Sequence, residues 1–250
     1  MNIREAVDKY NRKTSQYIVA YLDILGVASR MSQDKESQIL PLNKLHNLYK
    51  STMELTNKTN GIKFLRGIKF KIFSDNIVIT KKLSLNSSER ILDIFSVLNC
   101  ASHFQASSVG DSVGWLVRGG ITIGELFINN TIVWGSELLR AYELEKNIAI
   151  YPRVVIDLNI LPELKCNKEI ADYLLLDFDG VSFLNYMHIW HYAGEIVMNG
   201  FNKMKSEARK LDGLYPDKIY QKLNWHMNYI NCELDKKNER KDKNYRLTLD

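Results

Sequence analysis

Short segments rich in β-branched and aromatic residues alternate along this chain with longer segments of helical periodicity, and this alternation limits the possible folds strongly. Residues 17–22 alternate in the manner of a strand, with Tyr17, Val19 and Tyr21 facing one side, and this strand is expected to end at Asp23. Further strands are predicted at 68–73, 77–80, 115–127, 132–134 and 151–156, and helices from about Gly26, from Pro41, from Ser88 and over 135–146. The order βααββαββαβ predicts an α+β fold of ferredoxin-like type, in which helices pack on one face of a single sheet.

The remaining residues predict a C-terminal extension to this core. A hairpin over 173–187 is expected to turn at Asp179-Gly180, and two helices should follow over 195–211 and 216–234. Trp225 and Tyr229 are interpreted as helix-packing or dimer-contact residues. Nine of the twelve residues from 235 to 246 are charged, so a solvated tail is expected from about 235. We therefore divide the chain into a core, 1–157, and an extension packed on it, 158–250.

The composition narrows the class of function. Lys and Arg number 34 and Asp and Glu 29, which gives a net charge of +5 spread along the chain. This balance is compatible with an anionic ligand but argues against a dedicated nucleic-acid binder. Three widely spaced cysteines favour reduced thiols over disulfides or a zinc site. The polar start and the lack of an apolar run of roughly 20 residues predict a cytoplasmic protein that does not bind membranes.

Two aspartates define the candidate site. Asp23 ends the first strand, and Asp75 lies at the tip of the hairpin that turns at Ser74-Asp75-Asn76. If the two strands are neighbours, both carboxylates emerge at one edge of the sheet, beside the helix expected to start at Gly26. Carboxylate and carbonyl oxygens hold Mg²⁺ or Mn²⁺, and N–H groups at a helix start receive phosphate oxygens. The pair therefore predicts a site for a nucleoside triphosphate with two divalent cations, although each aspartate alone is also explained as a turn residue.

Three motifs in this part of the chain resemble those of class III nucleotidyl cyclases, in the order of that family. Residues 21–26, Tyr-Leu-Asp-Ile-Leu-Gly, resemble its first metal motif, and residues 71–75, Lys-Ile-Phe-Ser-Asp, resemble its second, in which a Gly usually precedes the Asp. Residues 117–124, Val-Arg-Gly-Gly-Ile-Thr-Ile-Gly, are similar to its Arg-x-Gly-Ile-x-x-Gly strand. Together with 133–137 and 141–153, these segments look most like the bacterial pyrimidine cyclases of the Pycsar anti-phage defence systems.

The resemblance implies a function and a set of roles. The enzyme would convert UTP or CTP to the 3′,5′-cyclic nucleotide and pyrophosphate, and the product would activate a separate effector protein. Asp23, Asp75 and the main-chain carbonyl of Ile24 would bind two divalent cations, Mn²⁺ or Mg²⁺. The residues expected to bind the nucleotide are Tyr21, Gly26, Lys71 and Arg118. Class III cyclases are dimers with shared active sites, so the partner's helix over 135–145 would complete the site.

The chain departs from the family at positions that matter for catalysis. Leu139 stands where the family has a transition-state Asn, and Glu143 stands where it has an Arg. Arg140, on the same helix face as Glu143, is expected to replace that Arg as the catalytic cation. Lys71 matches the adenine-type base-reading residue, but Ile132 at the second such position cannot accept a hydrogen bond from an adenine amino group. This combination agrees with a pyrimidine substrate.

Other interpretations stay open at this stage. A palm-domain nucleotidyltransferase that makes a di- or oligonucleotide signal also needs two carboxylates beside a ferredoxin-like sheet. A degenerate cyclase fold that acts as a binding or dimerisation module would explain Leu139 and Glu143. Gly119-Gly120 fits close strand packing at least as well as phosphate contact, and Arg118 fits a salt bridge as well as a site role.

Overall fold

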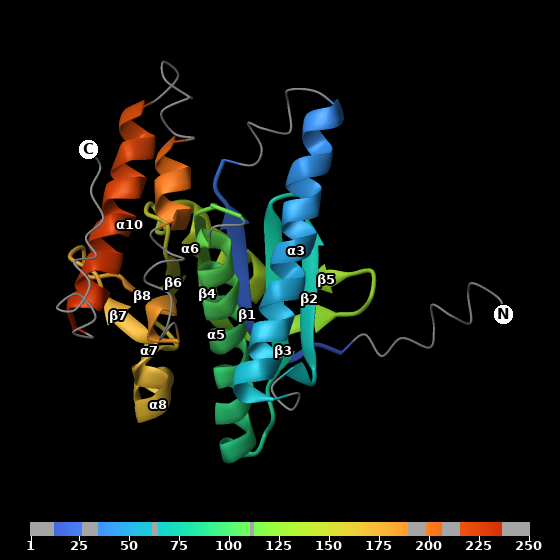
Figure 1. Ribbon diagram of the computed structural model, residues 1–250. Coiled ribbons are helices and arrows are strands. Elements are labelled where there is room, and N and C mark those ends of the chain that lie inside the picture. Colours follow the sequence, from blue (N-terminus) through green and yellow to red (C-terminus); the bar gives the residue numbers. More distant parts are fainter. Residues whose placement is uncertain are drawn as a thin grey trace.

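The molecule is built around one mixed sheet. The computed structural model describes residues 13–26, 35–61, 65–110, 113–189, 199–206 and 216–236. The strand order is β2-β3-β1-β4-β6-β8-β7, and β5 pairs with the far end of β4 (Figure 1). The strands are β1 (Ser15–Ile24), β2 (Ile68–Phe73), β3 (Asn76–Lys82), β4 (Val117–Ile128), β5 (Val133–Trp134), β6 (Val154–Ile156), β7 (Leu174–Leu176) and β8 (Ser182–Leu184). The predicted α+β class is confirmed.

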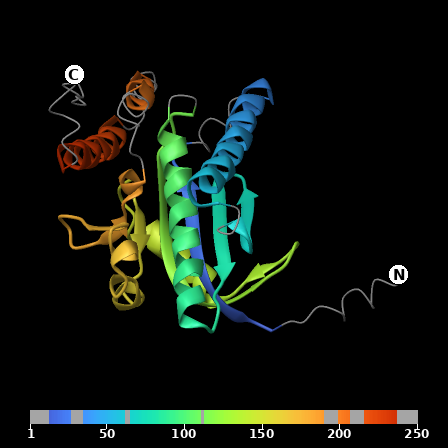
Figure 2. The same cartoon turned by 60° about the horizontal axis from the view of Figure 1, so that its bottom comes forward.

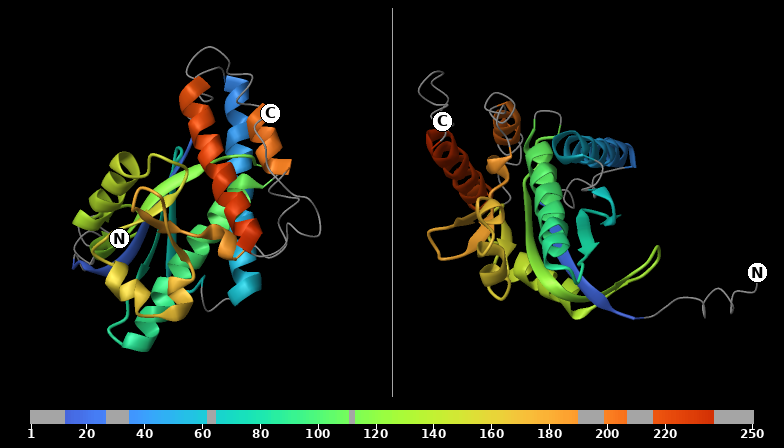
Figure 3. Two further views of the ribbon diagram at one scale, coloured as in Figure 1. Left: turned by 90° about the vertical axis from the view of Figure 1, so that its left-hand side faces the viewer. Right: turned by 90° about the horizontal axis from the view of Figure 1, so that it is seen from below.

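Helices cover both faces of the sheet. They are α3 (Lys35–Asn60), α5 (Ser87–Val109), α6 (Ser136–Asn147), α7 (Leu161–Lys165), α8 (Lys168–Ala171), the 3₁₀ helix η1 (Tyr186–His188) and α10 (Pro216–Lys236), with another helical stretch over 199–206. α3 and α5 lie side by side over one face, and α6 lies on the other (Figures 2 and 3). The prediction that helices pack on one face only is therefore wrong. Its physical reason lies in β1, where every side chain from Tyr17 to Leu22 is buried, so both sides need cover.

The alternation read from the sequence of β1 separates two packing surfaces. Ile18, Ala20 and Leu22 belong to the main core, together with residues of α5 such as Phe104. Tyr17, Val19 and Tyr21 face the other way and cluster with Ala141 of α6. The predicted strand thus has the expected faces, and it runs two residues further at each end than expected.

The succession β1, α3, β2, β3, α5, β4 is a β-α-β-β-α-β unit whose four strands pair antiparallel in the order β2-β3-β1-β4. β6 joins β4 in parallel, and the hairpin of β7 and β8 joins β6. The sheet therefore continues across residue 157, where the sequence analysis placed the end of the core. α10 packs on the extension, because Tyr229 and Trp225 cluster with Phe183 of β8 and Tyr186 of η1.

The hairpin of β2 and β3 turns at Ser74 and Asp75, as predicted, with Phe73 and Asn76 as the last paired residues. Ser74 has φ of 60°, in the left-handed region that favours glycine in two-residue hairpin turns. Ser74 therefore takes a conformation that a glycine would adopt at lower cost.

Some predicted boundaries differ from the structure. α3 already includes Lys35, so the helix start expected at Pro41 is wrong, and Pro41 lies inside the helix. The side chains on either side of Pro41, Leu40 and Leu42, are exposed. The helix expected from Gly26 lies largely outside the described residues, as do parts of the predicted helix 195–211 and the charged tail from 237. Among the described helices, none is long and apolar enough to span a bilayer.

Candidate active site

Asp23 and Asp75 lie together at one edge of the sheet, where β1 ends and β3 begins. The cross-strand partner of Asp23 is Asn76, the residue after Asp75. The main-chain N–H of Ile24 donates to the carbonyl oxygen of Asp75 at 2.9 Å. β1 and β3 are thus neighbours, which is the arrangement on which the predicted two-carboxylate site depends.

Arg118 joins this edge from β4, on the other side of β1. Its position opposite Asp23 in the antiparallel register brings Nε within 3.0 Å of the Asp23 Oδ2 atom. Its Nη2 atom lies 2.7 Å from Oε1 of Glu145, a residue of α6. Arg118 was expected to serve either a salt bridge or the site, and it forms a salt bridge with Asp23, one of the two aspartates of the candidate site.

Glu145 is a third carboxylate of the site that the sequence analysis did not select. Its side chain is only 5% exposed. Burial raises the pKa of Glu145, and Asp23 and Asp75 raise it further, whereas Arg118 lowers it. A signal existed in the sequence, since Glu145 lies four residues after Ala141 on the apolar face of a predicted helix. A carboxylate on a buried face needs a partner, and that partner here is Arg118.

Tyr21 orients the second aspartate. Its hydroxyl donates to Oδ1 of Asn76, and Nδ2 of Asn76 donates to Oδ1 of Asp75 at 3.1 Å. Burial, followed by the negative charge of Glu145 and Asp23, raises the pKa of Tyr21 to about 12. The phenol therefore stays protonated as a donor. The structure links Tyr21 to the candidate metal ligands through Asn76, which the sequence analysis treated only as a turn residue.

The glycines after Arg118 serve packing. A Cβ atom at Gly119 would lie 2.3 Å from the carbonyl oxygen of Tyr21, and one at Gly120 would lie 2.4 Å from that of Ala141 in α6. Gly120 is thus covered by a helix rather than open to a phosphate. Gly26, at the end of the described segment after β1, has φ of 79°, a conformation that favours glycine.

Lys71 and Arg140 lie apart from the two aspartates within this chain. Nζ of Lys71 donates to the carbonyl oxygen of Asn130, which ties β2 to the loop between β4 and β5. Arg140 is bound by Asp157 through Nε at 2.7 Å and Nη2 at 3.3 Å. Burial alone would raise the pKa of Asp157, but the bonds from Arg140 and the main-chain N–H of Asn159 hold it below the ordinary value. A catalytic role for Arg140 would therefore require a second subunit.

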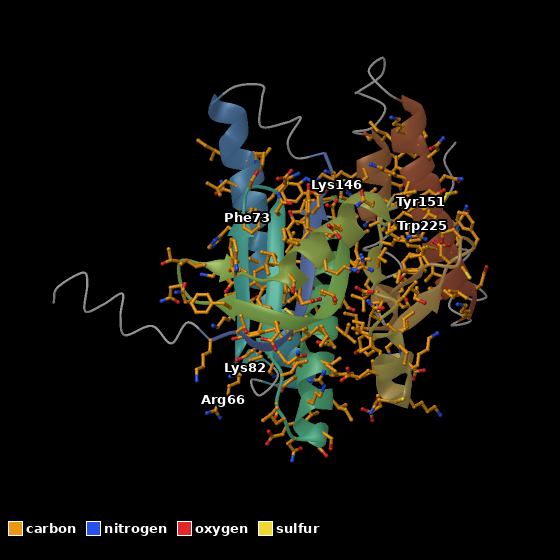
Figure 4. All side chains as sticks on the ribbon, turned by 180° about the vertical axis from the view of Figure 1, so that it is seen from behind. Arg66, Phe73, Lys82, Lys146, Tyr151 and Trp225 are labelled. Atoms are coloured by element: carbon orange, nitrogen blue, oxygen red, sulfur yellow. The ribbon has the colours of Figure 1, made fainter. Side chains whose placement is uncertain are left out.

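Two exposed aromatic side chains lie beside this edge. Phe73 of β2 and Tyr142 of α6 flank the ring of Tyr21, at centroid distances of 6.4 and 5.6 Å. Figure 4 shows Phe73 and Lys146, whose ammonium lies over the Tyr142 ring, toward the same end of the molecule. Among the exposed apolar side chains are Phe73, Ile132, Trp134, Leu139 and Tyr142, and we call these five the exposed apolar surface. Exposed apolar side chains of this kind are typical of a protein–protein contact.

The donors at the site suit a hard divalent cation. Asp23 and Asp75 present carboxylate oxygens, the ligands that Mg²⁺ and Mn²⁺ prefer. Glu145 is a third carboxylate near them, and Arg118 binds both Asp23 and Glu145. Within the described residues, no three His, Cys, Asp or Glu side chains form a metal cage by themselves. A cation held by the two aspartates would need main-chain or phosphate oxygens as further ligands, as the predicted role of Ile24 supposes.

No protein-family model matches the chain, and no curated protein matches it.

Proposed function

We propose that this protein is a metal-dependent nucleotide cyclase that converts UTP or CTP to the 3′,5′-cyclic nucleotide and pyrophosphate. The observation that carries the proposal is the meeting of Asp23 and Asp75 at one edge of the sheet, with Arg118 beside them. These residues come from the three segments that resemble the metal motifs and the Arg-x-Gly-Ile strand of class III cyclases. The β-α-β-β-α-β unit agrees with the ferredoxin-like core of that family.

In this proposal the chain positions the substrate and its counter-ions. Asp23 and Asp75 would bind two divalent cations, and the hydrogen bonds from Tyr21 through Asn76 would keep Asp75 in place. When bound, the cations would lower the pKa of the ribose 3′-hydroxyl and neutralise the departing pyrophosphate. In-line attack forms the O3′–Pα bond, breaks the bond from Pα to the bridging oxygen and releases the hydroxyl proton to water. Arg118 would stabilise negative charge that develops on the phosphates.

The exposed apolar surface supports a homodimer as the active form. Leu139 and Tyr142 lie on the same helix as Arg140, and Leu139 is 64% exposed. Burial of this surface against a second copy would carry α6 of one subunit toward the other subunit's site. Arg140 would then approach the partner's nucleotide, with Asp157 holding its guanidinium in position. The resemblance also implies anti-phage signalling through a separate effector, and the polar start and the cysteine pattern predict a cytoplasmic location.

A direct test is to incubate the purified protein with all four nucleoside triphosphates and Mn²⁺ and to identify products by mass spectrometry. We expect cyclic UMP or cyclic CMP from the wild type and none from Asp75→Asn. Asp172→Asn, which removes an exposed carboxylate from the extension, is the control and should retain activity. A linked product with more than one base would identify an oligonucleotide-forming enzyme. A folded protein that binds nucleotide without forming product would identify the degenerate module favoured by Leu139 and Glu143.

A further inference from the structure

Helix α6 approaches β4 closely at Gly120, two residues after Arg118. The two residues share a face of β4, because successive residues of a strand alternate between faces. A Cβ atom at Gly120 would lie 2.4 Å from the carbonyl oxygen of Ala141 and 2.6 Å from Cβ of Leu144. A glycine at this position therefore lets the helix lie this near the strand. Glu145 directly follows Leu144, so the close approach brings its carboxylate to Arg118.

The two carboxylates that bind Arg118 differ in burial and in geometry. Nε of Arg118 donates to Oδ2 of Asp23 at 3.0 Å, and Nη2 lies 2.7 Å from Oε1 of Glu145. The side chain of Asp23 is 16% exposed, whereas that of Glu145 is only 5% exposed. Within the described residues, Oε1 of Glu145 accepts no well-aligned hydrogen bond, so its contact with Arg118 is an ion pair. A guanidinium has several N–H donors, so Arg118 can turn further toward Glu145.

The contact between Arg118 and Asp23 competes with the role proposed for this aspartate. Oδ2 of Asp23 accepts from Arg118, whereas a divalent cation needs carboxylate oxygens as ligands. A cation at Asp23 would also repel a guanidinium bound to the same carboxylate. Such a cation favours an Arg118 side chain that has turned toward another anion. The buried carboxylate of Glu145 is suited to be that anion, because it already contacts the guanidinium.

We propose that Glu145 is a positioning residue, which holds Arg118 at the site while Asp23 exchanges the guanidinium for a divalent cation. This inference rests on the proposed function, in which Asp23 and Asp75 bind the cations. Without Glu145, Arg118 would have Asp23 as its carboxylate partner and would compete with the cation for it. With Glu145, the guanidinium stays beside the site, where it can stabilise the phosphates. Cation binding and the direction of Arg118 are then coupled through one buried carboxylate.

The test measures binding of Mn²⁺ alone to the full chain, separately from the chemical reaction. The electron paramagnetic resonance signal of the free ion reports how much Mn²⁺ is bound. We expect Glu145→Gln to weaken Mn²⁺ binding about 10-fold, because it removes a group that orients the surroundings of a metal ligand. In an Arg118→Gln background the same substitution should change binding by less than about twofold, because the competing guanidinium is absent.

Two further variants separate position from charge. Glu125→Gln is the charge-matched control and should bind Mn²⁺ like the wild type, because Glu125 is exposed on β4, roughly 23 Å from Arg118 along the strand. Glu145→Asp keeps the charge and shortens the side chain, and it replaces Glu145→Gln if that variant does not fold. A positioning role predicts weaker Mn²⁺ binding by Glu145→Asp, whereas a role of charge alone predicts no change. Thermal unfolding verifies that each variant is folded.

The outcomes distinguish the inference from the proposed function. If the wild type forms cyclic nucleotide but Glu145→Gln binds Mn²⁺ like the wild type, the role of Glu145 is wrong and the cyclase stands. If no cyclic product forms but the effect of Glu145→Gln on Mn²⁺ binding requires Arg118, the positioning role stands and the cyclase does not. Equal losses with and without Arg118 would overturn the inference, because Glu145 would then act on the cation directly. Absence of Mn²⁺ binding by the folded wild type would also overturn it.

Discussion

Two clusters in this molecule combine one arginine with two carboxylates, yet they are built for different purposes. Arg118 pairs with Asp23 and Glu145 at the edge of the sheet, and its side chain remains 26% exposed. Arg153, in the extension side of the sheet, pairs with Asp177 and Asp179 of the β7–β8 hairpin and is fully buried. The same residue types thus produce an open cluster and a closed one.

The closed cluster is completed by aromatic rings. Tyr151 and Trp225 stack on each other at 5.6 Å, and the guanidinium of Arg153 lies near both rings. Nε1 of Trp225 also donates to Oδ2 of Asp177 at 2.8 Å. Figure 4 shows Tyr151 and Trp225 close together. Asp177 accepts from both Arg153 and Trp225, so the cluster joins α10 to the hairpin.

The open cluster keeps its charges within reach of solvent, since the side chains of Arg118 and Asp23 are partly exposed. Asp75 adds a third carboxylate beside Asp23 and Glu145, and the carboxylates raise the pKa of Tyr21 and Glu145, after burial itself. The comparison shows that paired charges alone do not mark a site. A charged cluster that is closed by packing stabilises the fold, whereas one that solvent reaches can bind a ligand.

The largest expected effect on stability belongs to Arg153→Leu. Removal of this cation leaves the carboxylate of Asp177 buried without its partner, which should lower the free energy of unfolding by about 3–5 kcal/mol. Arg90→Leu is the control, because Arg90 forms an exposed bidentate pair with Glu163 and should cost less than about 1 kcal/mol. Denaturant unfolding measures both. If the two variants lose the same free energy of unfolding, the distinction between buried and exposed ion pairs is wrong.

Arg118→Gln should affect activity more than stability. The side chain of Arg118 is partly exposed, but the buried carboxylate of Glu145 loses its partner, so the free energy of unfolding should fall by about 1–3 kcal/mol. If the protein is the cyclase proposed above, turnover should fall roughly 10²-fold, because a preorganised cation beside the phosphates is lost. Arg90→Gln serves as the control with unchanged turnover. A folded Arg118→Gln protein with wild-type turnover would assign Arg118 to the fold alone.

Asp157→Asn tests the pair that holds Arg140. Asp157 is buried, and its pKa in the folded protein lies below the ordinary value, so its ionised form stabilises the fold at neutral pH. This stabilisation is present above the ordinary pKa of Asp and is lost as the pH falls through the lower folded value. The variant should cost about 1–2 kcal/mol at pH 7, and the difference from the wild type should shrink in strong acid. A difference that does not depend on pH would contradict the assignment.

The smallest expected effect is a gain in stability. Ser74→Gly relieves a left-handed conformation, with φ of 60°, in the turn that carries Asp75. We expect the free energy of unfolding to rise by about 1 kcal/mol, measured by chemical denaturation. Ser74→Ala keeps the conformational cost and should not stabilise the protein. If both variants have the same stability, the strain at Ser74 is not significant.

Part of the site could be predicted from sequence because it depends on local pattern. Alternation in residues 17–22 predicts β1, and Ser74-Asp75-Asn76 predicts the turn that presents Asp75. The same local rules misplaced the start of α3, since Pro41 is compatible with a first helical turn but does not require it. These rules also placed all helices on one face of the sheet, because the alternation in β1 does not reveal which elements cover each face.

The amino-acid sequence by itself determined the mixed α+β class, the strands that carry Asp23, Asp75 and Arg118, and the turns that end them. Periodicity and turn chemistry act over a few residues, so they can be read without a fold. Only the tertiary structure decided that Glu145 reaches the same edge, because it comes from a helix far from Asp23 and Asp75 in the chain. It also decided that aromatic rings bury Arg153 whereas Arg118 stays partly exposed, since solvent access depends on how distant segments pack.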